Sequence, residues 1–138
     1  MAKAKVVKAV KNKEKVKKVK NREVSAIGKA FVFSGYNNTI VTVTDLEGNT
    51  VCWGSSGKNN FRGSRKSTPY AATVVGEDVA RAALSKGVKE VSAYMKGVGS
   101  GKSQCVKALR NGGLVINRII DITPMAHNGC RAKKRRRV

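Results

Sequence analysis

Acidic residues are scarce in this chain of 138 residues, and so are other side chains that enzymes use for catalysis. Asp and Glu total 8, and the single histidine is His127. Glu77 and Asp78 form a carboxylate pair, but adjacent positions on a helix point in different directions. General acid–base catalysis and metal-assisted hydrolysis need such groups to be placed together. The composition therefore argues against an enzyme.

Cysteines and long apolar runs are also few. Cys52, Cys105 and Cys130 are odd in number and widely spaced, unlike the framework of a secreted disulfide-rich protein. A zinc site would need all three beside His127, whereas Cys52 and Cys105 fall in a predicted strand and helix, where small buried apolar residues are the simpler interpretation. We therefore expect no metal and no cofactor. With no membrane-spanning run and no signal peptide, a cytoplasmic location fits best, and an organellar source stays open.

Basic residues, in contrast, are abundant and unevenly distributed. Lys and Arg total 29, for a formal net charge of +21. Residues 1–22 carry ten basic residues and one acid, residues 131–137 carry six basic residues and no acid, and the stretch between them has a net charge of +6. Such a charge needs an anionic partner, and counterion release favours a polyphosphate. We expect a globular domain over 23–122 that binds nucleic acid, with basic arms at 1–22 and 123–138.

The hydrophobic pattern predicts strands first and then alternating helices and strands. The expected strands cover 23–32, 39–45, 50–53, 90–95 and 114–122, and the expected helices cover 69–86 and a second segment ending near 111. The first three strands should form an antiparallel meander, and right-handed crossovers should make the last two parallel. The continuous apolar run at 114–122 predicts a buried central strand. The fold class is thus α/β, with a mixed five-stranded sheet and two main helices.

A basic loop containing glycine precedes each predicted helix. The loop at 55–67 leads into Thr68 and Pro69, a favourable N-cap followed by proline at the first helical position. The loop GVGSGKS at 97–103 resembles a nucleotide-binding P-loop, but Gly97 lies four residues before Gly101 where five are required, so nucleotide hydrolysis is not supported. A loop of small residues at a helix start still suits a phosphate of RNA.

Aromatic residues, at 5% of the chain, offer few platforms for base stacking. We expect no strand to carry the repeated aromatics of an RNA-recognition motif. Trp53 is interpreted as a residue of the core or its edge. Tyr36 and Phe61 lie in predicted loops and are better stacking candidates, although anchoring of the loops is an equal interpretation. Recognition should rest on phosphate, ribose and RNA shape.

Four stretches of the sequence resemble the family of universal small-subunit ribosomal protein eleven, in its bacterial form. They are YNNTIVTVTD (36–45), FRGSRKSTPYAA (61–72), KGVGSGKS (96–103) and DITPMAHNGCRAKKRRRV (121–138). The chain departs from the family pattern at Val98, Lys102 and Ser103 in the glycine loop. It also departs at Ala126, Ala132 and Lys133 in the tail, where prolines are usual, and in a longer, more lysine-rich N-terminal arm. These differences affect the paths of the loop and tail rather than the partner.

The resemblance implies a three-layer ribonuclease-H-like fold without that fold's catalytic carboxylates. It also implies a structural role in translation, with binding to ribosomal RNA in the platform of the small subunit, near the side where the messenger leaves. Expected neighbours are small-subunit proteins six, eighteen and seven, and neither a membrane nor a second copy of the chain is an expected partner. The residues expected to bind ribosomal RNA lie in two loops and the C-terminal arm. They are Lys58, Asn59, Asn60, Arg62, Gly63, Ser64, Arg65, Lys66, Lys96, Gly97, Gly99, Gly101, Lys102, His127, Asn128, Arg131, Lys133, Lys134, Arg135, Arg136 and Arg137.

Two alternatives from other classes share the charge of this chain. A DNA-compacting protein would usually have a dimer interface and a minor-groove wedge, and the sequence indicates neither. A membrane-active helix would use valines of the N-terminal arm, such as Val6 with Val10. A P-loop enzyme, the third hypothesis, predicts stabilisation by nucleotide. RNA binding is favoured because only this function uses both glycine-bearing loops.

Overall fold

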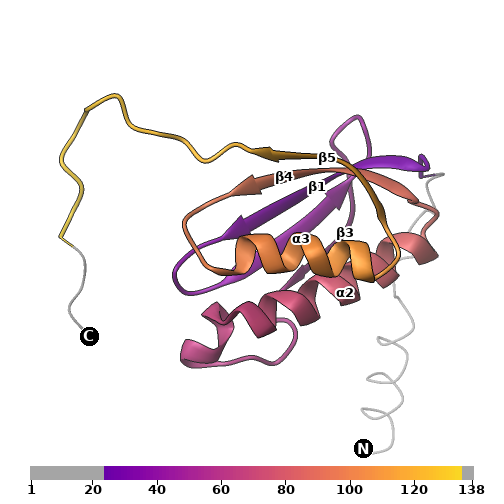
Figure 1. The fold of residues 1–138 in the computed structure, drawn as a ribbon, viewed down its shortest axis with the longest axis horizontal. Helices are drawn as coiled ribbons and strands as arrows, with labels where there is room; N and C mark the ends of the chain where they lie inside the picture. Colours follow the sequence, from indigo (N-terminus) through magenta and orange to yellow (C-terminus); the bar gives the residue numbers. More distant parts are fainter. Residues whose placement is uncertain (1–23, 135–138) are drawn as a thin grey trace, which may run out of the picture.

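Three strands come first in the chain, and helices and strands then alternate. The computed structural model describes residues 24–134, so the N-terminal arm at 1–22 and Arg135, Arg136 and Arg137 lie outside the described residues. The elements, in order, are β1 (Ile27–Ser34), β2 (Thr39–Thr44), β3 (Thr50–Ser55), the 3-10 helix η1 (Gly63–Ser67), α2 (Pro69–Ser85), β4 (Glu90–Lys96), α3 (Gly101–Asn111) and β5 (Val115–Asp121) (Figure 1).

The five strands form one mixed sheet in the order β3-β2-β1-β4-β5. β1 pairs antiparallel with β2, and β2 pairs antiparallel with β3, so the expected meander is confirmed. β4 is parallel to both β1 and β5, as the crossovers predicted. Because β3 runs in the same direction as β1, four of the strands point the same way.

Both α-helices cover the same face of this sheet (Figure 1). The connections from β3 through α2 to β4, and from β4 through α3 to β5, advance across the sheet in one direction. Right-handed crossovers in one direction place their helices on one side. The α/β fold with a mixed five-stranded sheet and two helices is therefore confirmed. The described residues form two of the three layers that the resemblance implies, and the other face of the sheet is open.

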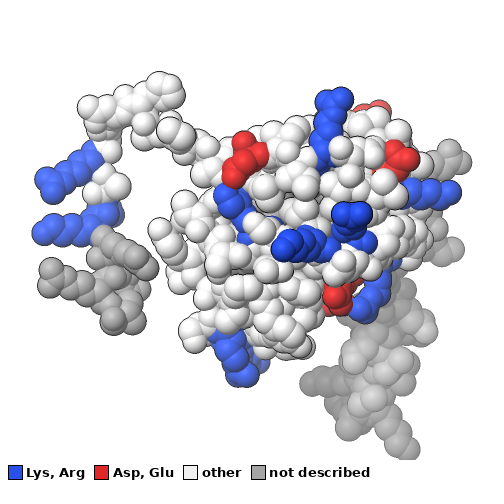
Figure 2. Space-filling view, in the orientation of Figure 1, with Lys and Arg blue, Asp and Glu red and all other residues white. Residues whose placement is uncertain are grey.

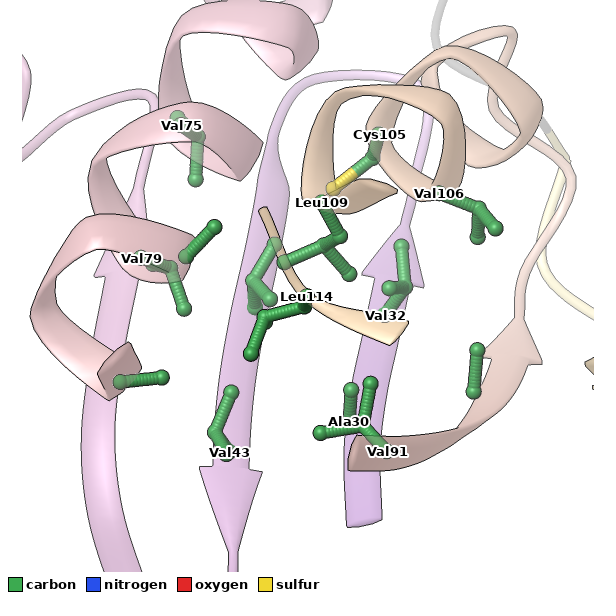
Figure 3. Close-up of a cluster of buried hydrophobic side chains, with 14 of the residues drawn as sticks. Ala30, Val32, Val43, Val75, Val79, Val91, Cys105, Val106, Leu109 and Leu114 are labelled. Atoms are coloured by element: carbon green, nitrogen blue, oxygen red, sulfur yellow. The ribbon is translucent and has the colours of Figure 1, made fainter. Parts of the chain in front are cut away.

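The core lies between the two helices and the sheet and is built from small apolar side chains. Figure 3 shows Val32 and Val43 of the sheet facing Val75 of α2 and Leu109 of α3, with Leu114 between them. The helices approach closely because Gly76 of α2 packs against α3, where an added Cβ would lie 2.7 Å from the Cβ of Ala108. The face of α2 that packs on the sheet includes the buried residues Val75, Val79 and Ala83, whereas Ala82 is half-buried.

β5 is not the buried central strand that its apolar sequence predicted. It lies at the edge of the sheet, and Val115 and Ile119 are 55% and 58% exposed. The central position is taken by β1, because the two successive crossovers move outward from it and leave β5 last. A run of apolar residues is common to central strands and to edge strands that lack a covering layer, so the sequence alone did not separate the two cases.

The aromatic residues of the strands were also interpreted incorrectly. Trp53 is 52% exposed rather than part of the core. Phe31 and Phe33 alternate with buried residues along β1, so both point to the open face of the sheet, and one strand does carry repeated aromatics. Cys52 and Cys105 are buried, as interpreted from the sequence.

Candidate nucleic-acid interface

The segments predicted to bind RNA meet at one edge of the sheet. Because β1, β3, β4 and β5 point the same way, their carboxyl ends lie together, on the left in Figure 1. We call this the carboxyl edge: it comprises the turn at 35–38, the loop and η1 at 56–68, the glycine loop at 97–100 and the arm that begins at 122. Open α/β sheets characteristically bind ligands beyond the carboxyl ends of their strands.

The glycine loop packs tightly against the end of β1. The N–H of Gly99 donates to the carbonyl of Ser34 at 2.9 Å, and the N–H of Gly97 donates to Thr123 Oγ1 at 3.1 Å. Gly97 has a φ of +109°, and a Cβ there would lie 2.2 Å from the Ser34 oxygen. A Cβ on Gly99 would lie 2.4 Å from the oxygen of Gly35. These glycines are therefore needed for close packing within the chain, and two of the loop's N–H donors are already used.

The start of α3 directly follows this loop and offers an anion site. Its N-cap, Ser100, makes no side-chain capping bond, and the first turn of the helix contains no acidic residue. Gly101 is buried, and a Cβ on it would lie 2.7 Å from Thr39 Oγ1. N–H groups at a helix start carry partial positive charge that attracts anions. The first turn of α3 is therefore a suitable place for a phosphate.

Lys102, in that same turn, is paired with a carboxylate of β5. Its Nζ lies 2.7 Å from Oδ2 of Asp121, and the N–H of Thr123 donates to Oδ1 of Asp121 at 2.9 Å. The hydrogen bond from Lys102, followed by those from Thr123, holds the pKa of Asp121 well below its usual range. The pair ties the end of β5 to α3 and fixes the direction in which the arm leaves the sheet.

In the loop after β3, three predicted residues make or allow contacts within the chain. The Nζ of Lys58 donates to the carbonyl of Trp53 at 3.0 Å and lies 4.6 Å from the centre of the indole ring. The amide of Asn59 donates to Asp78 of α2. Asn60 has a φ of +62°, a left-handed conformation that asparagine tolerates better than most residues. These residues shape the loop.

The side chains that follow in η1 are available to a ligand. Arg62, Ser64 and Arg65 are exposed and Lys66 is half-buried. Within residues 24–134, no ion pair involves any of these three basic side chains, and the first turn of η1 holds no acidic residue. Gly63, at a φ of +57°, allows the sharp turn between the loop and η1. This is the most concentrated uncompensated charge on the described part of the loops.

Thr68 joins η1 to α2, as its sequence context predicted. Its hydroxyl accepts a hydrogen bond from the N–H of Ala71 at 3.2 Å and donates to the carbonyl of Arg65 at 2.8 Å. Pro69 occupies the first helical position, where a missing N–H costs nothing. One side chain therefore sets the helix start and holds the basic turn beside it.

The C-terminal arm extends away from the sheet (Figure 1). Figure 2 shows Lys and Arg side chains on this part of the arm, with no acidic residue among them. His127 Nδ1 lies 3.2 Å from the carbonyl of Met125, and Asn128 adopts a φ of +73°. The remaining predicted residues of the described arm are all exposed: Arg131, Lys133 and Lys134.

The turn between β1 and β2 was missing from the predicted contact residues. It lies between the glycine loop and the loop after β3, because Ser34 bonds to Gly99 and the N–H of Ser56 donates to the carbonyl of Thr39 at 3.1 Å. Tyr36, at its tip, is 63% exposed. The signal was present, since YNN opens one of the family-like stretches, but Tyr36 was considered only as a stacking candidate.

The described residues contain neither a candidate metal site nor a helix that could span a membrane. Residues 24–134 contain no group of three His, Cys, Asp or Glu side chains arranged to hold a metal ion. Burial raises the pKa of the Cys105 thiol to about 12, which makes it unreactive. In the same part of the chain, no helix is long and apolar enough to cross a bilayer.

Fold and site together define a class: a basic α/β domain that presents uncompensated charge from one edge of a sheet, as nucleic-acid-binding proteins do. Comparison with known proteins is more specific. The model of the family "Ribosomal protein S11" matches residues 28–137. The small ribosomal subunit protein uS11 of Chlamydia trachomatis serovar D is 50% identical over 131 residues, which are 94% of this chain and 99% of that protein. The protein of the same name from Flavobacterium johnsoniae is 47% identical over 115 residues, 83% of this chain and 91% of that protein.

The chain therefore belongs to the ribosomal protein S11 family, and the resemblance drawn from the sequence is confirmed. It is a structural constituent of the small ribosomal subunit and not an enzyme. In the ribosome it associates with ribosomal RNA and with other ribosomal proteins.

Proposed function

We propose that the carboxyl edge and the C-terminal arm bind ribosomal RNA in the platform of the small subunit, near the side where the messenger leaves. The observation that carries this proposal is the exposed pair Arg62 and Arg65, which have no acidic partner within residues 24–134, at the same edge as the uncapped start of α3. Proteins six, eighteen and seven of the small subunit are the neighbours that we propose.

The contacts at this edge suit phosphates rather than base edges. Guanidinium groups bind phosphate through two parallel hydrogen bonds, and arginine is preferred for this reason. Arg62 and Arg65 would hold one strand of RNA while the first turn of α3 receives another phosphate. The lysines and arginine of the arm, Arg131, Lys133 and Lys134, would continue along the backbone. Binding of this kind fixes position and orientation and depends steeply on salt.

The predicted residues divide into two roles under this proposal. The glycines at 97, 99 and 101, together with Lys58, Asn59 and Lys102, hold the two loops in shape through contacts within the chain. The exposed basic residues of η1 and the arm contact the RNA, and so does Lys96 at the end of β4. The division into an N-terminal arm (1–22), a domain (23–122) and a C-terminal arm (123–138) is part of the same proposal.

Footprinting on small-subunit ribosomal RNA tests this proposal directly. The full chain should protect a compact set of backbone positions in the RNA of the platform, and the double variant Arg62→Ala, Arg65→Ala should lose part of that protection. Protection confined to RNA outside the platform would contradict the location. Protection that the double variant retains in full would contradict the role of η1.

A further inference from the structure

The face of the sheet opposite the helices is open and carries large aromatic side chains. Phe31, Phe33 and Trp53 are 37%, 47% and 52% exposed, and Ile40 is 37% exposed. Both α2 and α3 lie on the other face (Figure 1), and within residues 24–134 no element covers these side chains. This surface, which we call the open face, adjoins the carboxyl edge: Lys96 lies opposite Phe33, and Lys58 of the loop after β3 lies over Trp53.

The pairing register places the aromatic side chains in rows across the strands. Thr42 lies opposite both Trp53 and Phe31, and Phe31 lies opposite Tyr94, so one row crosses four strands. With strands about 4.8 Å apart, this row is roughly 14 Å long. The rings of Phe31 and Tyr94 stack on one another with centroids 5.2 Å apart. Phe33 lies in the next row, between Ile40 and Lys96 and nearer the carboxyl edge.

Positive charge surrounds these rows. Lys29 and Lys96 lie on the open face at either end of the Phe31–Phe33 segment, and Arg118 of β5 is paired with Ser92 beside Lys29 in the register. Lys58 lies over the ring of Trp53. The acidic residue of this face, Glu90, accepts a hydrogen bond from Asn117. An apolar protein partner would leave the four cations at the rim without counter-charges. A single strand of nucleic acid matches both the cations, through its phosphates, and the aromatic rings, through its flat bases.

We propose that the open face binds unpaired bases of single-stranded RNA, with bases stacked on Phe33 and on the side of Trp53 that Lys58 does not cover. Phosphates would be held by Lys96, by Arg118 and by Lys29, whose Nζ also donates to the carbonyl of Leu46. Aromatic platforms with a cationic rim bind single strands with little sequence preference, since every base has a flat face. The stacked Phe31–Tyr94 pair forms the apolar floor between the two platforms. The proposal deepens the RNA-binding function proposed above by adding a second surface for unpaired nucleotides.

Trp53 is the single tryptophan of the chain, so its fluorescence reports on the open face. Titration of the full chain with a short oligouridine should quench this fluorescence and reach saturation. The double variant Phe31→Leu, Phe33→Leu keeps the face apolar and the charge unchanged. It should bind oligouridine roughly tenfold more weakly or worse, because stacking is lost, while its affinity for inorganic polyphosphate, which has charge but no bases, stays the same.

Two control variants and one fallback variant make the result decisive. Tyr70→Leu removes an aromatic ring of α2 that is 70% exposed, more than either phenylalanine, and should leave oligouridine binding unchanged. Phe33→Tyr keeps the ring and should bind as the wild type does. If the double leucine variant is unstable, Phe33→Leu alone serves, because that half-exposed ring is not part of the core.

Equal binding of oligouridine by the wild type and the leucine variants would overturn the proposal. Reconstitution of small subunits with the leucine variant gives a second test. If these subunits lack a neighbouring protein while the variant still binds RNA as the wild type does, the proposal is overturned and the face is assigned to a protein. A different result would contradict the role proposed for the carboxyl edge. In that case Arg62→Ala with Arg65→Ala leaves binding to small-subunit RNA unchanged, while oligouridine binding still depends on Phe33.

Discussion

The two edges of the sheet carry turns of different kinds. At the edge opposite the carboxyl edge, the turn between β2 and β3 satisfies its own polar groups: Asp45 accepts hydrogen bonds from the N–H and side-chain amide of Asn49, and these bonds lower its pKa. Gly48 has nothing within 4 Å of where its Cβ would lie. At the carboxyl edge, glycines are packed against neighbouring backbone, and Arg62 and Arg65 have no acidic partner among the described residues.

This difference distinguishes a turn that only reverses the chain direction from turns that pack together and form a binding surface. A self-satisfied turn with open space around it tolerates change, because neither packing nor charge depends on it. At the carboxyl edge, four segments from distant parts of the sequence are joined by hydrogen bonds to Ser34, Thr39 and Thr123. Their charge is therefore displayed in a fixed arrangement before any RNA arrives, which reduces the ordering cost of binding.

The largest expected effect comes from adding one methyl group to a glycine at each edge. Gly97→Ala should destabilise the chain by about 3 kcal/mol, because the new Cβ meets the Ser34 carbonyl and the φ is unfavourable. Gly48→Ala has an equally unfavourable φ of +95° but open space, and should cost only about 1 kcal/mol. Urea unfolding of the full chain measures both, and equal losses would mean that the close packing at Ser34 does not matter.

RNA binding should depend on charge at one edge and not at the other. Arg62→Ala with Arg65→Ala should reduce the slope of log affinity against log salt by about two. Lys86→Ala with Lys89→Ala removes the same charge at the opposite edge and should change the slope by much less than one unit. Filter binding to small-subunit ribosomal RNA over a range of salt tests this. Equal slopes for the two double variants would show that only the total charge counts.

The start of α2 should be sensitive to its capping hydroxyl. Thr68→Ala removes the bond to the N–H of Ala71 and should lower the free energy of unfolding by about 1 kcal/mol. Thr73→Ala, five residues further along the same helix, loses only a bond to the carbonyl of Pro69 and should be close to neutral. Thermal unfolding of the two variants side by side gives the comparison, and a neutral Thr68→Ala would remove the capping role.

The smallest expected effect concerns Asp121, whose side chain is exposed. Since its pKa is lower in the folded chain, the stability that it contributes is fully present above its ordinary pKa of 3.8 and is lost as the pH falls towards the lower folded value. Asp121→Asn should flatten this acid-side loss slightly. It should also speed proteolysis of the arm at neutral pH, because the arm's exit is no longer held.

Asp45→Asn is the matched control for that experiment, since hydrogen bonds from Asn49 also lower the pKa of Asp45, at the opposite edge. It should change the acid-side stability in the same direction but leave cleavage of the arm unaffected. Arm cleavage that is the same in both variants would contradict the role assigned to the Lys102–Asp121 pair.

The elements were predictable from local patterns, because alternation, capping residues and glycines act over a few neighbours. Thr68 with Pro69, and the β-branched run at 39–45, located α2 and β2 almost to the residue. The two loops were also identified as basic segments at helix starts, and the arm as a basic terminal segment. Their convergence followed from strand direction, which right-handed crossovers fix.

Residue environments that depend on the third dimension were not predictable in the same way. Whether β5 lies at the centre or at the edge of the sheet depends on the order of all five strands. The apolar sequence of β5 does not indicate this order. The exposure of Trp53 depends on which elements cover that face of the sheet, and within residues 24–134 none does. The pairing of Lys102 with Asp121 joins residues 19 apart in the chain, so charge counted along the sequence overstated what Lys102 offers to RNA.

The outer side of β5 affects how the chain behaves when it is not bound in the ribosome. No described strand pairs with that side, so its backbone groups and the neighbouring Val115 and Ile119 form a ready template for a strand from another molecule. Arg118, in the middle of the strand, is the one charge along it that opposes such pairing before Asp121 at its end. Copies of the chain outside the ribosome should therefore self-associate through this strand.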